Sequence, residues 1–354
     1  MIHLPRVYLS HVTARRRSAL ALGFVLVASA LVAAPASPGA AFDVPGGGAA
    51  SDNAAASSAS TAANPSATPI AVTTPKPGYD AVGRWIAGLA AGDTQSPTPS
   101  PSPTCTAYCT DVPVPAPEST PDPASAVSFK LHVPIFEYHR VKPFNGEHGF
   151  SHDLIVPPQT FAAQMDAMAA AGWKTITMGE LGDDLRFGIA PPPKSFVVTL
   201  DDGYEDGYQN AFPLLLEHGF KATFFVIAGR IGSPLYLTPF ELGQLVRAGM
   251  EIGNHSYSHQ DVAAMTPDRL VGEIYGASAI ISRYTGSWPK SFAYPKGFTS
   301  GVVQDYLSRV PGLNTAVLES GSKPESWSIR WQLTRIRVGP ATYPSELVDR
   351  ASRY

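Results

Sequence analysis

The part of the chain from Ala126 onward alternates between short apolar runs and segments with a helical pattern. The runs are rich in β-branched and aromatic residues, which favours strands. The expected strands are Lys130–Tyr138, Ser195–Leu200, Ala222–Ala228, Met250–Gly253, Ser291–Tyr294, Thr315–Leu318 and Leu333–Val338. The expected helices are Gln159–Ala171, Asp206–His218, Pro239–Ala248, Pro267–Thr285 and Gly301–Val310. Repeated strand–helix units predict an α/β fold with a mostly parallel sheet, and about seven strands suit a closed or nearly closed barrel, in which the chemistry gathers at the C-terminal strand ends.

Residues at the helix ends agree with these boundaries. Thr238 and Thr266 each precede a proline, an arrangement typical of an N-cap and the first helical position. Gly172, Gly219 and Gly249 stand where three of the helices should end, because glycine readily adopts the left-handed conformation that closes a helix.

Proline is concentrated before the predicted barrel. Of the 34 prolines in 354 residues, 15 lie between Ser37 and Ser125, in a stretch of mainly Ala, Ser, Thr and Pro. Such a composition lacks the apolar surface that offsets the entropy cost of ordering a chain. Residues 37–125 are therefore predicted to form a disordered linker that its alternating prolines keep extended.

The first 36 residues have the features of an export segment. Arg15, Arg16 and Arg17 precede an uncharged apolar run from Ser18 to Ala34, and small residues follow it. The run fits either a cleaved signal peptide or a retained N-terminal membrane anchor, since its 17 residues are near the lower limit for a span. In both cases the rest of the chain is expected to be exported, and the membrane is expected to be contacted only through an uncleaved segment 1–36. Residues 126–354 would then act outside the cell, at the cell surface or in the cell wall.

Charge and cysteine content narrow the function further. Residues 126–354 carry 20 Lys and Arg against 22 Asp and Glu, which leaves no electrostatic signature of nucleic-acid binding. Cys105 and Cys109 are the only cysteines, and in an exported chain the pair is expected to form a local disulfide. A metal or redox role for them would need further ligands or a strand–helix–strand context, and the sequence around them offers neither.

Polar side chains follow two of the predicted strands. Asp201 and Asp202 end one buried strand, where two adjacent carboxylates either form a solvated turn or share a cation. His255 and His259 follow another strand, four residues apart. If the backbone makes one helical turn there, both imidazoles face the same side and can bind one metal ion. Two His and one Asp leave a coordination position open for water, as in a catalytic metal site.

Two further strand ends carry weaker signals. Tyr294 and Pro295 end one strand, and alone they indicate only a turn with an aromatic residue. His139 ends the first strand, and a lone histidine there fits either a hydrogen-bonded rim residue or a catalytic group.

Three of these segments resemble the motifs of a known family. Thr199–Gly203, His255–His259 and Phe292–Pro295 are similar to the first three motifs of the polysaccharide deacetylases, carbohydrate esterase family 4, and the resemblance extends over residues 133–338. The resemblance implies a deformed (β/α)7-type barrel with the active site at the C-terminal strand ends, and a divalent metal held by Asp202, His255 and His259. Zinc is the metal we expect, and cobalt, nickel or iron suit the same ligands. It also implies that Asp201 is the general base, and that Tyr294 and Pro295 bind substrate and the oxyanion, with a backbone N–H near Tyr294 as donor.

The sequence departs from the family pattern in two places. The usual Leu-x-His motif, which supplies the acid, reads Leu333-Thr334-Arg335 here, and arginine does not give up a proton near neutral pH. Either the acid is lost, or the chain resembles the circularly permuted poly-β-1,6-N-acetylglucosamine de-N-acetylases and His139 is the acid, which we favour. The family's arginine before the third motif is also absent, so Arg335 or Arg337 is expected to orient Asp201.

These features predict a hydrolase that removes N-acetyl groups from an extracellular polysaccharide containing N-acetylglucosamine. An O-acetyl polysaccharide esterase is one alternative, because the first chemical steps are the same. A non-catalytic polysaccharide-binding or assembly protein is another, although such a protein has no reason to keep the full set of polar strand-end residues. The sequence leaves the polymer and the oligomeric state open.

Overall fold

The computed structural model describes residues 129–319, 321 and 323–354. The predicted signal or anchor at 1–36, the linker at 37–125 and the cysteine pair lie outside the described residues and stay predictions. Within the described part, no helix has both the length and the apolarity needed to cross a bilayer.

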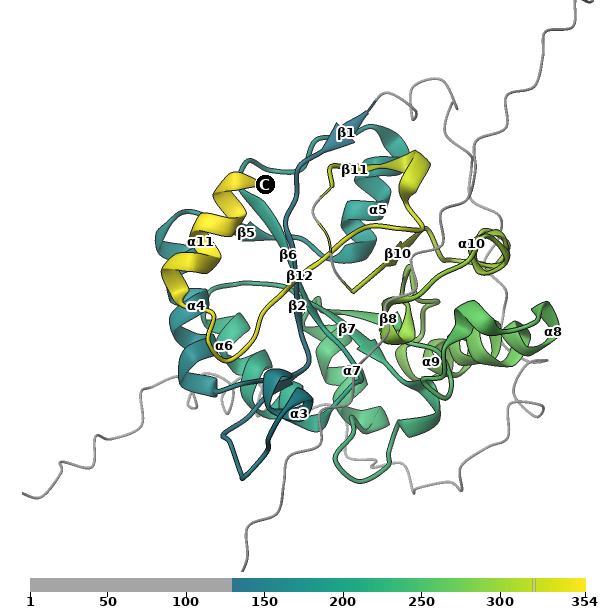
Figure 1. Cartoon of the computed structure of the whole chain (residues 1–354), viewed down its shortest axis with the longest axis horizontal. Helices are drawn as coiled ribbons and strands as arrows, with labels where there is room; N and C mark the ends of the chain where they lie inside the picture. The colour runs from purple at the N-terminus through teal and green to yellow at the C-terminus, as the bar shows by residue number, and fades with distance from the viewer. Residues whose placement is uncertain (1–128, 320, 322) are drawn as a thin grey trace, which may run out of the picture. The chain divides into compact units, whose positions relative to one another are not determined.

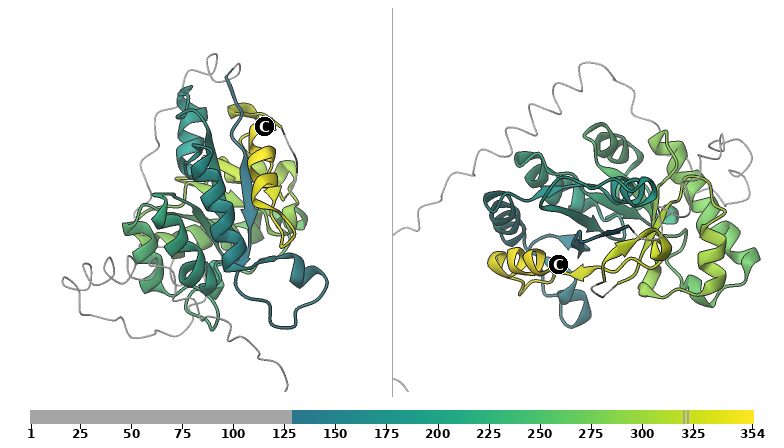
Figure 2. Two further views of the ribbon diagram at one scale, coloured as in Figure 1. Left: turned by 90° about the vertical axis from the view of Figure 1, so that its left-hand side faces the viewer. Right: turned by 90° about the horizontal axis from the view of Figure 1, so that it is seen from above.

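The central feature is a curled sheet of eight strands (Figures 1 and 2) in which every pairing is parallel. In spatial order the strands are β10 (Thr315–Val317), β9 (Ser291–Ala293), β8 (Glu251–Asn254), β7 (Thr223–Val226), β6 (Ser195–Leu200), β2 (Ile135–Tyr138) and β12 (Ile336–Arg337), with β5 (Lys174–Thr175) also paired to β6. A parallel bridge between Val317 and Leu333 joins the β10 edge to the segment that leads into β12, so the two edges of the sheet meet. The prediction of a deformed parallel α/β barrel is confirmed.

Helices pack around this sheet (Figure 1). They are α3 (Phe150–Asp153), α4 (Pro158–Ala170), α5 (Met178–Phe187), α6 (Phe212–Glu217), α7 (Pro239–Arg247), α8 (Pro267–Leu270), α9 (Ala277–Thr285), α10 (Gly301–Leu307) and α11 (Pro344–Arg353). Two short strand pairs lie outside the sheet, β1 (Lys130–Leu131) with β11 (Glu325–Ser326) and β3 (Arg140–Val141) with β4 (Ile155–Val156). Three of these helices, α3, α5 and α11, were not expected from the sequence.

Helix α5 was not predicted from the sequence because its two glycines lower its helix propensity. Each glycine lowers helix propensity by roughly 1 kcal/mol relative to alanine. Packing explains why glycine is needed at Gly182, since a Cβ atom there would lie 2.3 Å from the side-chain oxygen of Asn314. The helix is instead anchored by Thr177, whose hydroxyl accepts the N–H of Glu180 while the Glu180 carboxylate accepts the N–H of Thr177.

The predicted helix ends are found where expected. Thr238 forms a capping box with Glu241 at the start of α7. Thr266 occupies the N-cap of α8, but its side chain makes no capping hydrogen bond. Gly172, Gly219 and Gly249 have φ angles of 79°, 64° and 83°, the left-handed conformation that ends a helix.

We expect Thr238→Ala to lower the free energy of unfolding by about 1 kcal/mol, because the first turn of α7 loses an acceptor for its N–H groups. Thr266→Ala is a matched control, since this threonine is also an N-cap before proline but makes no side-chain cap. Urea denaturation of both variants measures the difference. Equal losses in the two variants would contradict the role of the Thr238 hydroxyl.

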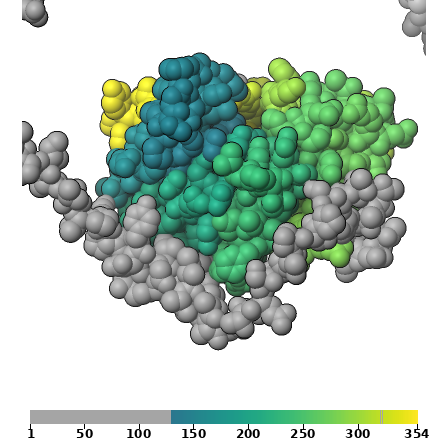
Figure 3. All heavy atoms as spheres, turned by 90° about the horizontal axis from the view of Figure 1, so that it is seen from below, coloured from purple at the N-terminus to yellow at the C-terminus, as the bar shows by residue number. Residues whose placement is uncertain are grey.

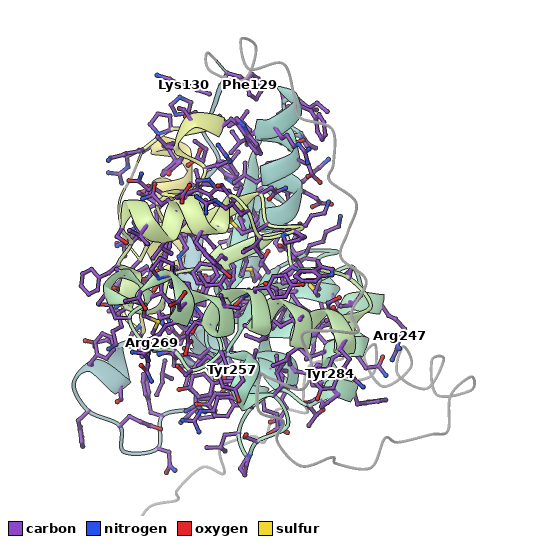
Figure 4. All side chains as sticks on the ribbon, turned by 90° about the vertical axis from the view of Figure 1, so that its right-hand side faces the viewer. Phe129, Lys130, Arg247, Tyr257, Arg269 and Tyr284 are labelled. Atoms are coloured by element: carbon purple, nitrogen blue, oxygen red, sulfur yellow. The ribbon has the colours of Figure 1, made fainter. Side chains whose placement is uncertain are left out.

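The parallel sheet brings the polar strand ends to one end of the molecule. Because all eight strands run the same way, the residues after β2, β6, β8 and β9 gather at the lower end in Figure 1. Figure 3 shows this end from below, where the blue part of the chain, which includes α3, lies beside the teal and green parts. Figure 4 shows Tyr257, which follows β8, at the end opposite to Phe129 and Lys130. The described chain therefore enters the fold far from the strand ends that carry the candidate site.

Candidate active site

The residues predicted to hold a metal lie together. The Nε2 atoms of His255 and His259 are 3.5 and 3.3 Å from Oδ1 of Asp202, and 3.2 Å from each other. Asp202 and His259 have φ angles of 70° and 61°, which are uncommon for residues other than glycine. Such backbone strain of about 1–3 kcal/mol is found preferentially at functional sites, where the surrounding structure holds it.

These three residues fit a divalent cation. Oδ1 of Asp202 is buried and has no hydrogen-bond partner within the described part of the chain. Nδ1 of His255 lies 2.9 Å from the carbonyl oxygen of Ala293. A carbonyl oxygen only accepts, so Nδ1 carries the hydrogen, and the Nε2 lone pair of the neutral ring points toward Asp202. Two histidine nitrogens and one carboxylate oxygen match the ligand set of a catalytic zinc-type site with an open position.

Asp201 is held by a buried arginine. Two nitrogens of the Arg335 guanidinium lie 2.7 Å from the two carboxylate oxygens of Asp201, the two-point geometry that arginine forms with carboxylates. Arg335 also donates to the carbonyl oxygen of Leu318 and to the hydroxyl of Thr199. Burial disfavours the ionised carboxylate, but the charge of Arg335 and the hydrogen bonds that it donates outweigh this effect and hold the pKa of Asp201 well below its ordinary value.

The second arginine, Arg337, lines the same cavity but pairs with other carboxylates. Arg337 contacts Glu137 at 2.9 Å and also pairs with Glu319. Of the two arginines expected to orient Asp201, the structure places Arg335 on its carboxylate and Arg337 on Glu137.

Glu137 is the main residue of the site that the sequence reasoning missed. It lies in β2, is fully buried, and has Arg335 at 3.3 Å as well as Arg337. Burial raises the pKa of Glu137 above its ordinary value, and the charge of Arg335 opposes that rise. The signal was present, because a carboxylate in the middle of the apolar run Pro134–Tyr138 needs a buried cation.

His139 lies against this charged group. Its Nδ1 atom is 3.7 Å from Oε1 of Glu137, and ligand atoms of His139, Glu137 and Asp201 all lie within 4.8 Å of one another. His139 therefore occupies the same site as Asp201, although the two residues follow different strands.

The structure narrows the choice of backbone N–H near Tyr294 that could serve as the predicted oxyanion donor. The N–H of Tyr294 donates to the carbonyl oxygen of Val317 at 3.1 Å, within the sheet, and the Tyr294 hydroxyl donates to Trp331. Pro295 has no N–H. The next main-chain N–H in this segment belongs to Lys296, which adopts a left-handed conformation with φ of 61° and lines the cavity. The third motif thus offers the N–H of Lys296, not that of Tyr294.

All these groups surround one small cavity with a volume of about 110 Å³. Since a water molecule takes roughly 30 Å³ of liquid, the cavity has room for a few waters or an acetyl group, but not for a sugar ring. The residues that line it are Glu137, His139, Phe150, Leu154, Asp201, Asp202, His255, His259, Tyr294, Lys296, Gly297, Glu319, Arg335 and Arg337.

Comparison with known proteins shows similarity to polysaccharide deacetylases. The family model described as Polysaccharide deacetylase matches residues 188–311. The Bacillus subtilis (strain 168) protein YxkH, classed by its name among the polysaccharide deacetylases, is 27% identical over 208 residues, which cover 59% of this chain and 72% of YxkH. A peptidoglycan-N-acetylglucosamine deacetylase of Bacillus cereus is 27% identical over 143 residues, 40% of this chain and 50% of that protein.

A solved structure gives the same result. The Streptococcus pyogenes deacetylase PplD, in complex with acetate, superimposes with a TM-score of 0.58 and 26% identity, covering 62% of this chain and 98% of that one. The fold and the polar strand ends define a deformed parallel barrel of the carbohydrate esterase type. The chain carries a polysaccharide deacetylase domain of carbohydrate esterase family 4.

Proposed function

We propose that this protein removes N-acetyl groups from a polysaccharide that contains N-acetylglucosamine, in a metal-dependent reaction outside the cytoplasm. The proposal rests on two groups of residues that line one cavity of acetyl size. The first group is Asp202 with His255 and His259, and the second is Asp201 with Arg335. The substrate class is supported by the similarity to a peptidoglycan-N-acetylglucosamine deacetylase. The location rests on the predicted export segment at 1–36.

In the proposed chemistry the first group holds the cation and the second accepts a proton. A divalent cation held by Asp202, His255 and His259 would supply a Lewis acid that makes an attacking water more acidic and polarises the acetyl carbonyl. Asp201 takes the proton of that water. Its low pKa keeps the carboxylate ionised, and Arg335 fixes the plane of both oxygens, each of which retains a second lone pair. The N–H of Lys296, a residue that lines the cavity, would donate to the oxygen on which negative charge develops.

The departing amine needs a proton, because an amide nitrogen is a poor leaving group without one. Arg335 occupies the position of the family's usual acid and cannot supply a proton near neutral pH. His139 is the remaining candidate in the cavity. Its Nδ1 faces Glu137, which leaves Nε2 to donate to substrate.

The experiment that tests the function is acetate release from N-acetylglucosamine oligomers and polymers, together with metal analysis of the full chain. We expect release with bound metal, loss of activity and of metal after chelation, and recovery of both on adding Zn²⁺. Release from O-acetylated polymer alone would instead identify an esterase. Oligomer binding by metal-loaded protein without release would identify a binding protein.

His139→Gln is expected to lower acetate release from N-acetyl substrate by about 10²–10⁴-fold, the usual contribution of a general acid. Release from an O-acetyl substrate should fall much less, since an alcohol is a better leaving group than an amine. The two rates measured side by side test the assignment. Unchanged amide cleavage would show that His139 is not the acid.

A further inference from the structure

A second and larger pocket lies beside the catalytic cavity. Its volume is about 500 Å³, within the range of roughly 300–1,000 Å³ that small-molecule pockets occupy. It is lined by Arg140, Lys142, Pro143, Phe144, Asn145, Glu205, Asp206, Gln209, Asn210 and Leu235. These residues follow strands β2, β6 and β7, so the pocket lies on the same end of the sheet as the catalytic cavity.

The two pockets share a wall, which we call the rim segment, residues 139–154. His139 and Phe150 line the catalytic cavity, whereas Arg140 and Phe144 line the larger pocket. The N–H of Arg140 donates to the carbonyl oxygen of Leu154 at 3.1 Å, which ties the two ends of the segment together. A chain-like ligand with one group in the catalytic cavity therefore reaches the larger pocket by crossing the rim segment.

Both cations that line the larger pocket are paired with carboxylates. Arg140 donates to Asp206 at 2.8 Å, and Lys142 pairs with Glu147. The two cations and two carboxylates among the lining residues also balance in number. Because the cations already have carboxylate partners, the pocket suits a neutral polar ligand better than an ion.

An aromatic ring at the pocket edge is held in place. Phe144 stacks on His152 with ring centroids 4.5 Å apart and planes 9° from parallel, and 43% of the residue remains exposed. The amide side chains of Asn145 and Gln209 lie around the same pocket. An aromatic surface beside amide and carboxylate groups fits a sugar ring, whose C–H groups pack on the aromatic residue while its hydroxyls form hydrogen bonds.

Leu235 gives a second indication of a ligand site. It is 63% exposed and has a φ of 72°. This conformation is costly for a leucine, and the hydrogen bond from the N–H of Glu205 to the Leu235 carbonyl holds it. This residue, with a strained backbone and an exposed apolar side chain, lines the same pocket as Phe144.

We propose that the larger pocket is a sugar subsite, which binds a neighbouring unit of the polymer while an N-acetyl group occupies the catalytic cavity. This inference rests on the proposed function. The catalytic cavity is too small for a sugar ring, so affinity for the chain must come from surfaces outside it. The enzyme should accordingly prefer oligomers to the monosaccharide.

The test is the length dependence of acetate release from neutral N-acetylglucosamine oligomers, with β-1,4 and β-1,6 linkages. In the wild type, kcat/KM should rise with length. Phe144→Ala should raise KM for the longer oligomers about five- to tenfold with kcat nearly unchanged, as expected for loss of a stacking contact made equally in the ground and transition states. Phe144→Trp should retain the rise. Phe187→Ala is the matched control, because Phe187 is 51% exposed at the end of α5 and lines neither pocket.

Binding of the same oligomers, measured by calorimetry, separates this inference from the proposed function. Phe144→Ala should weaken binding by a similar factor, and Gln209→Ala, at another residue that lines the pocket, should weaken it severalfold even if the first variant folds poorly. If the wild type releases no acetate but both substitutions weaken binding, the proposed function is wrong and the subsite stands. If acetate is released but the length dependence and the Kd survive both substitutions, the subsite is wrong.

Discussion

Asp201→Asn is expected to lower acetate release by about 10²–10⁴-fold while the protein still binds its metal. Asparagine keeps the shape of the side chain but removes the basic lone pair that accepts the proton of the attacking water. The metal ligands are expected to stay in place, because Asp201 is 4.0 Å from His255 and is tied to Arg335 instead. Steady-state rates and metal stoichiometry on the same preparation test the two halves of the prediction.

Asp202→Asn is the matched control, since the same substitution is made at the neighbouring residue. Asp202 provides the carboxylate oxygen nearest to both histidines, so this variant should lose metal and activity together. High activity of Asp201→Asn would remove Asp201 from the role of base. Loss of metal from Asp201→Asn would show that the two carboxylates act as one ligand group.

The strands and their polar ends were predictable because local sequence determines them. β6 is found at the predicted residues, since its six positions are all buried and form one uninterrupted run. Parallel strands bring their C-terminal ends to one edge, and so Asp202 and His255 meet although they are far apart in sequence.

The partner of Asp201 was less predictable, because it depends on long-range register. Arg335 and Arg337 are two positions apart in an extended segment, so both side chains point to the same side. The sequence alone could not choose between them. The closure of the sheet determines which arginine contacts Asp201. Leu333 bridges to Val317, and Ile336 pairs with Phe136. This register places Arg335 beside Asp201.

Long-range pairing also limits which N–H at the third motif is available. A backbone N–H after a strand end is a reasonable oxyanion donor only if the sheet does not use it. The N–H of Tyr294 donates to Val317 of the neighbouring strand, a contact that no local pattern reveals. The next N–H along this segment belongs to Lys296, beyond the proline, and Lys296 lines the cavity.

Arg335→Met is expected to lower the free energy of unfolding by about 3–5 kcal/mol, because the substitution leaves two buried carboxylates without their main cation. Arg335 is 2% exposed and contacts both Asp201 and Glu137. Arg337→Met is the matched control. The Arg337 side chain is 30% exposed, its partner Glu319 is also partly exposed, and its other partner, Glu137, keeps Arg335 in this variant, so the loss of Arg337 should cost less. Urea denaturation of the metal-free proteins at neutral pH measures both variants.

The pH dependence of the difference in unfolding free energy between wild type and Arg335→Met tests whether the lost charge causes it. In the wild type the pKa of Asp201 is held below its ordinary value of 3.8, so its ion pair stabilises the fold above that pH and is lost as the pH falls further. In Arg335→Met, burial without a cation should raise the pKa values of Asp201 and Glu137 above their unfolded values. Protonation then favours the folded variant at low pH, and the penalty appears as the pH rises through the raised pKa values. The gap between wild type and Arg335→Met should therefore be widest near neutral pH and should narrow toward pH 4, whereas a gap that stays constant with pH would attribute the loss to packing and not to charge.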